Sequence, residues 1–398
     1  MKNVRLHFFP LDNELKLLHG QYTPRLQESM TRLGGKLPFK EAKAEIWYAH
    51  RTSVPKATIH RTNRKHGQVA ERIDREKTEY LERTAPESTA NVTNLTMSSD
   101  GAFIHLTTGE WTEVKTVSVG ELRLGDEKNP AKTSKISYFS RKYGIREFER
   151  YALSELHRRG IDNANLVVSV NDGATWIQSF LEYHCPEAVR INDYYHSAEY
   201  VAQAGKAVYG DGDEFKNWYE GARSTLKKKP PREILGELKL LQPKAKTDDA
   251  EQEVSTALYY LEARKSQIDY AHFQKKGYPI GSGMGESAHK VVVQKRMKGA
   301  GMRWEESNVD GMLALRNLIC NERWDEGWIE ILNRPQPRYP RKRKDESEQS
   351  KAVDVPEKIT FNSVEVGIED VLEQPNEVQK PHPWREGKWP SYESRWLN

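Results

Sequence analysis

Three carboxylates occupy positions from which they could act together on a phosphodiester. Asp100 lies in SSDGAFIHL, Asp172 follows the apolar run LVVSVN, and Glu286 opens the segment GESAHKVVVQKRMKG. Enzymes that transfer phosphoryl groups with two metals hold the ions about 3.5–4 Å apart between such ligands. Mg²⁺ takes oxygen ligands and keeps several waters, so a few carboxylates suffice. The residue types predict two Mg²⁺ ions per site, with Mn²⁺ as a substitute, and Asp100 as the ligand shared by both.

Each acid also has an ordinary structural explanation. An Asp-Gly pair usually marks a turn, and both Asp100 and Asp172 precede a glycine. A glutamate in the first turn of a helix usually stabilises the helix dipole, which applies to Glu286. A shared site is favoured only by the three acids together, in this order along the chain.

Cations follow Glu286, and no acid intervenes before Glu305. A solvated helix stabilised by salt bridges would alternate the signs of its charges. Basic clusters on a chain whose net charge is only +4 indicate contact with nucleic acid at defined faces. Solvated surface and, for Trp304, burial in a helical core are the competing explanations. The residues expected to contact DNA are Lys56, Arg61, Arg64, Lys65, Lys290, Lys295, Arg296, Lys298, Arg303 and Trp304.

The elements that must position the acids follow from the pattern in residues 91–200. Alternating Val, Thr, Ile and Phe predict antiparallel strands, with turns at Asp100-Gly101 and Thr108-Gly109. An amphipathic segment ending at Gly160 predicts a helix. LVVSVN predicts a buried strand. The full order is three strands, helix, strand, helix, strand, helix, which is the outline of an RNase H-like α/β fold with a mixed sheet.

The N-terminal region is expected to be wholly helical. Gly34-Gly35 interrupts one helical pattern, and Ser53 is the expected cap of a later helix that has Pro55 in its first turn. Thr58, His60, Arg61, Asn63 and Arg64 on that later helix suit groove edges and phosphates. The arrangement predicts a helix-turn-helix. A three-helix unit with only a structural role is the alternative.

Five regions are therefore expected along the chain. Residues 1–90 form a helical, helix-turn-helix-like DNA-binding region, and 91–200 form the first part of a catalytic core. Residues 201–278 form a charged helical insertion, and 279–334 return to the core with the Glu286 helix. Residues 335–398 are rich in Pro, Glu and Lys and are expected to be largely disordered or extended.

Composition limits the setting in which the chain works. Its 398 residues are 36% hydrophobic and 30% charged. No run of about 18 apolar residues is present, so no membrane span is expected. Two cysteines cannot build a disulfide framework or a zinc site alone. The N-terminus lacks the features of a secretory signal. We therefore expect a cytoplasmic protein without a membrane partner.

Four segments resemble DDE transposases of the ISKra family of bacterial insertion sequences, which are related to Mutator-like transposases. They are SSDGAFIHL, VVSVNDGATWI, RINDYYHSAEY and PIGSGMGESAHKVVVQKRMKGAGMRW. The resemblance covers roughly residues 95–330. It implies a DDE core on an RNase H-like fold with a helical insertion, two Mg²⁺ ions and terminal-repeat DNA as substrate. It also implies a homodimer or larger assembly on DNA, near the bacterial nucleoid.

By position, the resemblance makes Asp100, Asp172 and Glu286 the catalytic, metal-binding triad. DYYH matches the Asp/Cys-x-x-His signature of these relatives and gives Asp193 and His196 supporting roles. Asp193 is the rival of Asp172 as second ligand, but LVVSVND is the more apolar strand. His196 either orients Asp193 or a phosphate, or is a core histidine held by a local hydrogen bond. Some relatives carry a cysteine-rich N-terminal metal-binding stretch, which this chain lacks.

The expected function is that of an insertion-sequence transposase, which binds element ends and catalyses DNA cleavage and strand transfer. A metal-dependent nuclease on the same fold, which cuts without joining, needs the same carboxylates. A non-catalytic DNA-binding protein derived from a transposase does not need them. A helix-turn-helix repressor would leave residues 91–334 unexplained.

Overall fold

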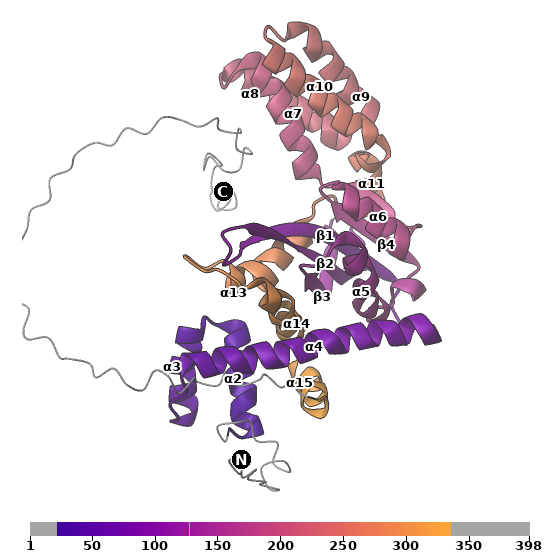
Figure 1. The fold of residues 1–398 in the computed structure, drawn as a ribbon. Helices are drawn as coiled ribbons and strands as arrows, with labels where there is room; N and C mark the ends of the chain where they lie inside the picture. The colour runs from indigo at the N-terminus through magenta and orange to yellow at the C-terminus, as the bar shows by residue number, and fades with distance from the viewer. Residues whose placement is uncertain (1–21, 127, 336–398) are drawn as a thin grey trace, which may run out of the picture. The chain divides into compact units, whose positions relative to one another are not determined.

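A five-stranded mixed sheet forms the centre of the computed structural model, which describes residues 22–126 and 128–335 (Figure 1). The strand order is β3-β2-β1-β4-β5. β1 pairs antiparallel with β2, as β2 does with β3, whereas the β1–β4 and β4–β5 pairs are parallel. The α/β class and the mixed sheet predicted from the sequence are confirmed. The strands are β1 (Asn94–His105), β2 (Trp111–Arg123), β3 (Lys132–Arg141), β4 (Leu166–Asn171) and β5 (Val189–Asn192).

The alternation of side chains along β1 gives the sheet two buried faces. Leu95 and Met97 belong to a core with α5 (Ile145–Arg158) and α6 (Thr175–His184). Ala102 and Ile104 point the other way and pack with segments from the C-terminal part of the described chain. Those segments are α12 (Gly283–Ala288), the π-helix η4 (His289–Gln294), α13 (Lys295–Met297) and α14 (Val309–Cys320).

β1 does not turn at Asp100-Gly101, so that prediction was wrong. The strand continues to His105, with Asp100 opposite Thr116. A Cβ atom at Gly101 would lie 2.1 Å from Glu113 Oε1, so this glycine leaves room for a side chain of β2. The turn lies only at residues 107–109, next to the second predicted position.

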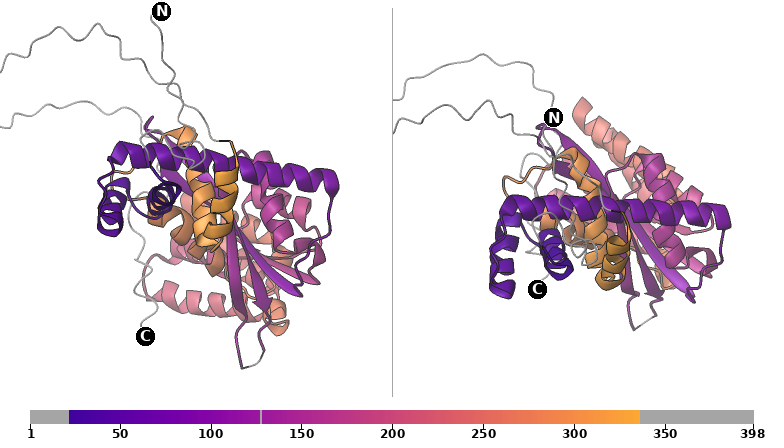
Figure 2. Two further views of the ribbon diagram at one scale, coloured as in Figure 1. Left: turned by 90° about the horizontal axis from the view of Figure 1, so that it is seen from below. Right: turned by 60° about the horizontal axis from the view of Figure 1, so that its bottom comes forward.

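Helices α2 (Pro24–Lys36), α3 (Phe39–His50) and α4 (Lys56–Thr84) precede the sheet. Ser53 does not cap α4, because Pro55 is its N-cap residue and provides no side-chain hydrogen bond. Asn63 is buried and donates to the Thr31 carbonyl, so it is not available to read a groove. α4 runs beside α14 and α15 (Trp324–Asn333), as Figure 2 shows. Residues 1–21 of the predicted N-terminal region lie outside the described residues.

Residues 201–278 contain helices and no strand in the described structure. Their apolar side chains share a core with Val168 and Val170 of β4 and Ile191 of β5. Helix α7 starts directly after β5 and leads into this group. The helices are α7 (Tyr194–Tyr209), α8 (Asp213–Lys228), α9 (Pro231–Leu241), α10 (Asp248–Ala263) and α11 (Tyr270–Lys275), with 3-10 turns at η2 (Gln242–Lys244) and η3 (Lys265–Gln267).

Two further 3-10 turns, η1 (Ile161–Asn163) and η5 (Glu306–Asn308), complete the described elements. Within residues 22–126 and 128–335, no helix combines the length and apolarity needed to cross a bilayer. Nearly all of the predicted tail, residues 336–398, lies outside the described residues.

Candidate active site

Asp100 is the centre of a group of carboxylates from three separate parts of the chain. Burial, followed by the charge of Asp172, raises the pKa of Asp100 to about 7. The charges of Glu113 and Glu286 raise it further, while the amide of Gly101 donates to Oδ1 at 2.7 Å and opposes the rise. Because the Asp100 side chain is still 40% exposed, the like charges are the more informative cause. Asp172 and Glu286 therefore each lie within electrostatic reach of Asp100.

Asp172 is positioned near Asp100 by a contact between the end of β4 and its neighbouring strand β1. The parallel pairing ends at Met97–Ser169, and the Asn171 side chain then accepts from the Ser99 amide at 2.7 Å. This side-chain hydrogen bond takes the place of the next backbone hydrogen bond between the two strands and holds the end of β4 against β1. Asp172 follows directly, and its Oδ1 accepts from the Ala174 amide at 3.0 Å.

Glu286 is brought to the same place by a close contact of α12 with β1. A Cβ atom at Gly285 would lie 2.5 Å from Ser98 Oγ and 3.9 Å from Asp100 Cβ. Only glycine allows the helix backbone to approach the strand this closely. The Glu286 side chain is 46% exposed and pairs with Lys290 Nζ at 2.8 Å.

The donor set suits a divalent cation by its chemistry, although the carboxylates do not form a closed ligand set. Among the described residues, no three His, Cys, Asp or Glu side chains are arranged to hold a metal ion. Glu286 is directed to Lys290, and Asp172 accepts a backbone amide. Neighbouring carboxylate charges nevertheless raise the pKa of Asp100, and a bound cation would relieve that repulsion. Metal binding would require rotation of side chains that are partly exposed, without movement of the strands.

His289 is a member of this site that the sequence analysis missed. Its ring is 3% exposed, and Nε2 lies 3.4 Å from Asp100 Oδ2. Neither ring nitrogen has a hydrogen-bond partner within the described structure. Burial lowers the pKa of His289 to about 4, so the ring is neutral near pH 7. The signal was its position three residues after Glu286, which places both on one side of a helical turn.

Glu113 was also missed, and no local pattern marks it. It lies on β2, its carboxylate reaches Gly101 of β1, and it pairs with Lys115 at 2.8 Å. Its place near Asp100 depends on the register of β1 against β2, which the sequence does not display.

Asp193 caps a helix instead of facing the other acids. It is 5% exposed, and its two carboxylate oxygens accept the amides of His196, at 2.8 Å, and Ser282. These bonds attach the start of α7 to the loop that precedes α12. Asp193 thereby helps to place Glu286 indirectly.

His196 lies against the rings of Tyr200 and Tyr260, with Nδ1 3.6 Å from a Glu199 carboxylate oxygen. Burial would lower the pKa of His196. The nearby Glu199 carboxylate and the charges of Asp172 and Asp193 outweigh burial and raise it. His196 therefore lies near Asp172 and does not orient the Asp193 carboxylate with its ring.

The predicted DNA-contacting residues divide into exposed and buried groups. Arg296 is 2% exposed, donates to the Gly34 carbonyl at 2.8 Å and lies over the rings of Phe39 and Trp304. Trp304 is 7% exposed, and its indole donates to the Met297 carbonyl. In this structure neither side chain is available to DNA: Arg296 joins the N-terminal helices to the core, and Trp304 is buried against β1 and the segment that carries Met297. Arg64 and Lys65 are half-buried, whereas Lys56, Arg61, Lys290, Lys295, Lys298 and Arg303 are exposed.

Lys298 is a second exposed cation near the acids, besides Lys290, which pairs with Glu286. Burial lowers its pKa, and the charge of Asp100 acts in the opposite direction. A positive charge therefore lies within reach of the carboxylate group from the same segment that carries Glu286.

Comparisons with protein-family models and with curated proteins give no match, so the family resemblance stays a prediction.

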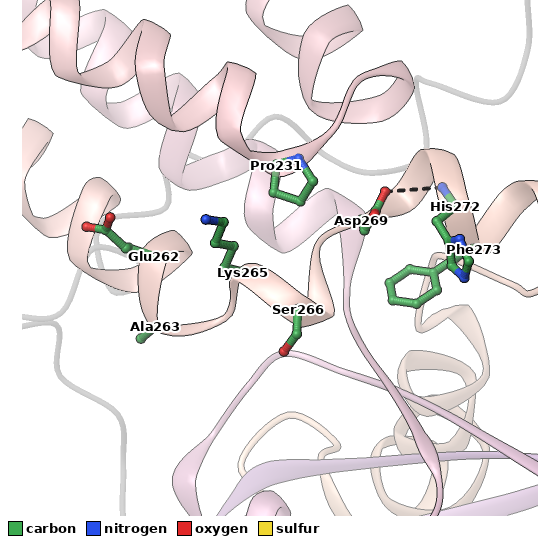
Figure 3. A pocket seen from close by; sticks show the side chains of 8 residues that line it. All are labelled: Pro231, Glu262, Ala263, Lys265, Ser266, Asp269, His272 and Phe273. Atoms are coloured by element: carbon green, nitrogen blue, oxygen red, sulfur yellow. Dashed lines mark hydrogen bonds between the residues drawn. The ribbon is translucent and has the colours of Figure 1, made fainter.

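An open hollow of about 740 Å³ lies elsewhere, among α9, α10, η3 and α11 (Figure 3). Its rim includes the Asp269 carboxylate, which accepts the His272 amide at 3.2 Å, and none of the three acids lines it. The residues that line it are Pro231, Glu262, Ala263, Lys265, Ser266, Asp269, His272 and Phe273.

Proposed function

We propose that this chain is a DDE transposase of the ISKra type, with an RNase H-like core and Asp100, Asp172 and Glu286 as its catalytic acids. The strand order β3-β2-β1-β4-β5, with three antiparallel and then two parallel strands, supports that core. The observation that carries the proposal is geometric: a Cβ atom at Gly285 would lie 3.9 Å from Asp100 Cβ, and the Asn171 side chain, next to Asp172, accepts from the Ser99 amide at 2.7 Å. Burial, with the charges of Asp172, Glu113 and Glu286, raises the pKa of Asp100 to about 7, which agrees with this arrangement. Asp172 and Glu286, which lie 72 and 186 residues after Asp100 in the chain, are thus both close to one carboxylate.

Each acid has a distinct place in the proposed reaction. Bound divalent ions would activate a water, and later a 3′-hydroxyl, and stabilise the leaving oxygen. Asp100, on the central strand, would be the shared ligand, with Asp172 and Glu286 on either side. For Glu286 to bind an ion, it must release Lys290, whose ammonium group would then be free for a phosphate.

The exposed cations supply the proposed DNA contacts. Lys295, Lys298 and Arg303 lie on the segment that follows Glu286 and would hold the backbone of the strand being cut. Lys56 and Arg61, on the first turns of α4, would hold a second part of the element end. Chemistry on paired DNA ends requires more than one subunit, so we propose a dimer or larger assembly on DNA in the bacterial cytoplasm.

The test is cleavage of labelled duplexes taken from the DNA that flanks the coding sequence, with Mg²⁺. Asp100→Asn preserves the shape of the side chain and removes its charge. Asp213→Asn, at a side chain that is 89% exposed, is the matched control. We expect cleavage by the wild type and the control and none by Asp100→Asn.

A second assay offers pre-cut ends to a target plasmid and measures joining. Joining supports the transposase, and cleavage without joining supports the nuclease. Equal cleavage by wild type and Asp100→Asn would place the chemistry elsewhere.

A further inference from the structure

The loop that carries Asp172 is held from outside the sheet by helix α10. The Tyr260 hydroxyl lies within hydrogen-bond distance of the backbone carbonyl of Asp172, which is 88 positions away in the chain, and of the Asn192 side-chain oxygen, at 3.0 Å, so its one proton is shared between these two acceptors. Arg264 Nη2 donates to the carbonyl of Gly173 at 2.8 Å. The two consecutive carbonyls beyond β4 are therefore bound by Tyr260, in the last turn of α10, and by Arg264, the residue that caps the C-terminus of that helix.

Tyr260 and Arg264 also support each other. The Arg264 guanidinium lies 3.9 Å from the centre of the Tyr260 ring, and its Nη1 donates to the Tyr260 carbonyl at 3.1 Å. On its other side, the Tyr260 ring stacks on Tyr200 with centroids 3.9 Å apart. Burial raises the pKa of Tyr260, so its hydroxyl keeps the proton that it donates.

The backbone at Gly173 packs tightly against Tyr260 and Arg264. Its φ is +82°, a conformation that favours glycine. A Cβ atom there would lie 2.4 Å from Arg264 Nε and 2.9 Å from the Tyr260 hydroxyl oxygen. A side chain at position 173 would therefore collide with both residues, so the loop backbone lies directly against Tyr260 and Arg264.

We propose that the helical insertion is a positioning element for catalysis, in which Tyr260 and Arg264 fix the backbone of Asp172 and so the direction of its carboxylate. Neither residue touches the proposed substrate or metal. The inference rests on the proposed function only in treating Asp172 as a metal ligand. Outer-shell partners of a ligand commonly change metal affinity by about 10–100-fold when they are removed.

The test uses the full chain with Tyr260→Phe, which removes the hydroxyl and keeps the stacked ring. Tyr200→Phe is the matched control, since in the described structure the Tyr200 hydroxyl makes no hydrogen bond to this loop. Arg264→Lys is a second variant, whose ammonium group cannot bridge two carbonyls as the guanidinium does. Thermal unfolding of each variant separates misfolding from loss of position.

Two readouts keep this proposal separate from the proposed function. In the metal-free protein, hydrogen exchange at the Gly173 and Ala174 amides should be faster in Tyr260→Phe than in the wild type or Tyr200→Phe. In calorimetry with Mn²⁺ alone, Tyr260→Phe should bind about tenfold more weakly, with Tyr200→Phe unchanged. Arg264→Lys should move both readouts in the same direction.

Each outcome decides one of the two claims. If the wild type binds Mn²⁺ and both variants bind it equally well, the positioning role is overturned and the function stands, even if exchange changes. We call the contact of Tyr260 and Arg264 with the Asp172–Gly173 backbone the clamp. If hydrogen exchange accelerates as expected but the wild type binds no Mn²⁺, the clamp is supported and the metal-dependent function is overturned. Unchanged exchange in both variants overturns the clamp.

Discussion

Nε2 of His289 lies 3.4 Å from Oδ2 of Asp100, in a ring that is 3% exposed and has a pKa lowered to about 4 by burial. A neutral histidine thus adjoins the carboxylate at the centre of the acid group. Neither ring nitrogen has a hydrogen-bond partner in the described structure, so we expect Nε2 to donate to Oδ2 after a small rotation of the Asp100 side chain and thereby to fix the direction of that carboxylate. His289→Gln, which retains a donor, should lower Mn²⁺ affinity less than His289→Leu does. Calorimetry with Mn²⁺ measures both, and equal affinity in His289→Leu and wild type would contradict this role.

The contact between α12 and β1 predicts a mutation with a specific rescue. Gly285→Ala places a methyl group 2.5 Å from Ser98 Oγ, so α12 must move and carry Glu286 away from Asp100. Cleavage should fall at least about tenfold, since misplacement of about 1 Å is costly in such sites. Ser98→Ala in the same chain removes that oxygen and should restore part of the rate. A double variant no better than Gly285→Ala would show that the contact does not position Glu286.

The raised pKa of Asp100 predicts a dependence of stability on pH in the metal-free protein. Folding raises this pKa from 3.8 to about 7, so the folded state holds the proton more tightly. The stabilisation is complete below the unfolded-state pKa and is lost as the pH rises through about 7. Asp100→Asn should therefore be more stable than wild type at pH 8, by roughly 1–2 kcal/mol after allowance for the exposed side chain, and the gain should shrink at pH 5. Denaturant unfolding at both pH values measures it, and a pH-independent difference would contradict it.

The same substitution at two arginines of one basic segment should have different effects, on stability at Arg296 and on DNA binding at Arg303. Arg296→Met removes a buried donor to the Gly34 carbonyl and should cost about 1–3 kcal/mol of unfolding free energy. Arg303→Met, at an exposed position, should change stability by less than about 0.5 kcal/mol. DNA binding across a salt series should show a slope smaller by about 1 for Arg303→Met only. A reduced slope in a folded Arg296→Met would show that this arginine reaches DNA.

The class of fold could be predicted because its signals are local. The alternation in residues 91–141 and the apolar run before Asp172 mark strands, and Gly160 marks the end of a helix. The predicted turn at Asp100-Gly101 failed because Gly101 serves a neighbouring strand, which a single segment does not reveal. Ser53 failed as a cap because proline can begin a helix without any side-chain bond.

In the candidate site too, some residues could be predicted from local sequence, and others depend on contacts between distant segments. Asp100, Asp172 and Glu286 were predicted from residue type and order and remain a prediction as metal ligands. The positions of Glu113 and of Tyr260 depend on the sheet register and on the path of the insertion, which no local pattern shows. The burial of Arg296 could not be read from a run of cations, because burial depends on Gly34 and Phe39, which are more than 250 residues away.

The most direct test of the shared carboxylate site is the anomalous signal of Mn²⁺ in crystals of the full chain with cleaved DNA ends. We predict two Mn²⁺ peaks about 3.5–4 Å apart, with Asp100 bound to both and Asp172 and Glu286 bound to one each. Mn²⁺ bound away from these three side chains, with Glu286 still paired to Lys290, would contradict the account.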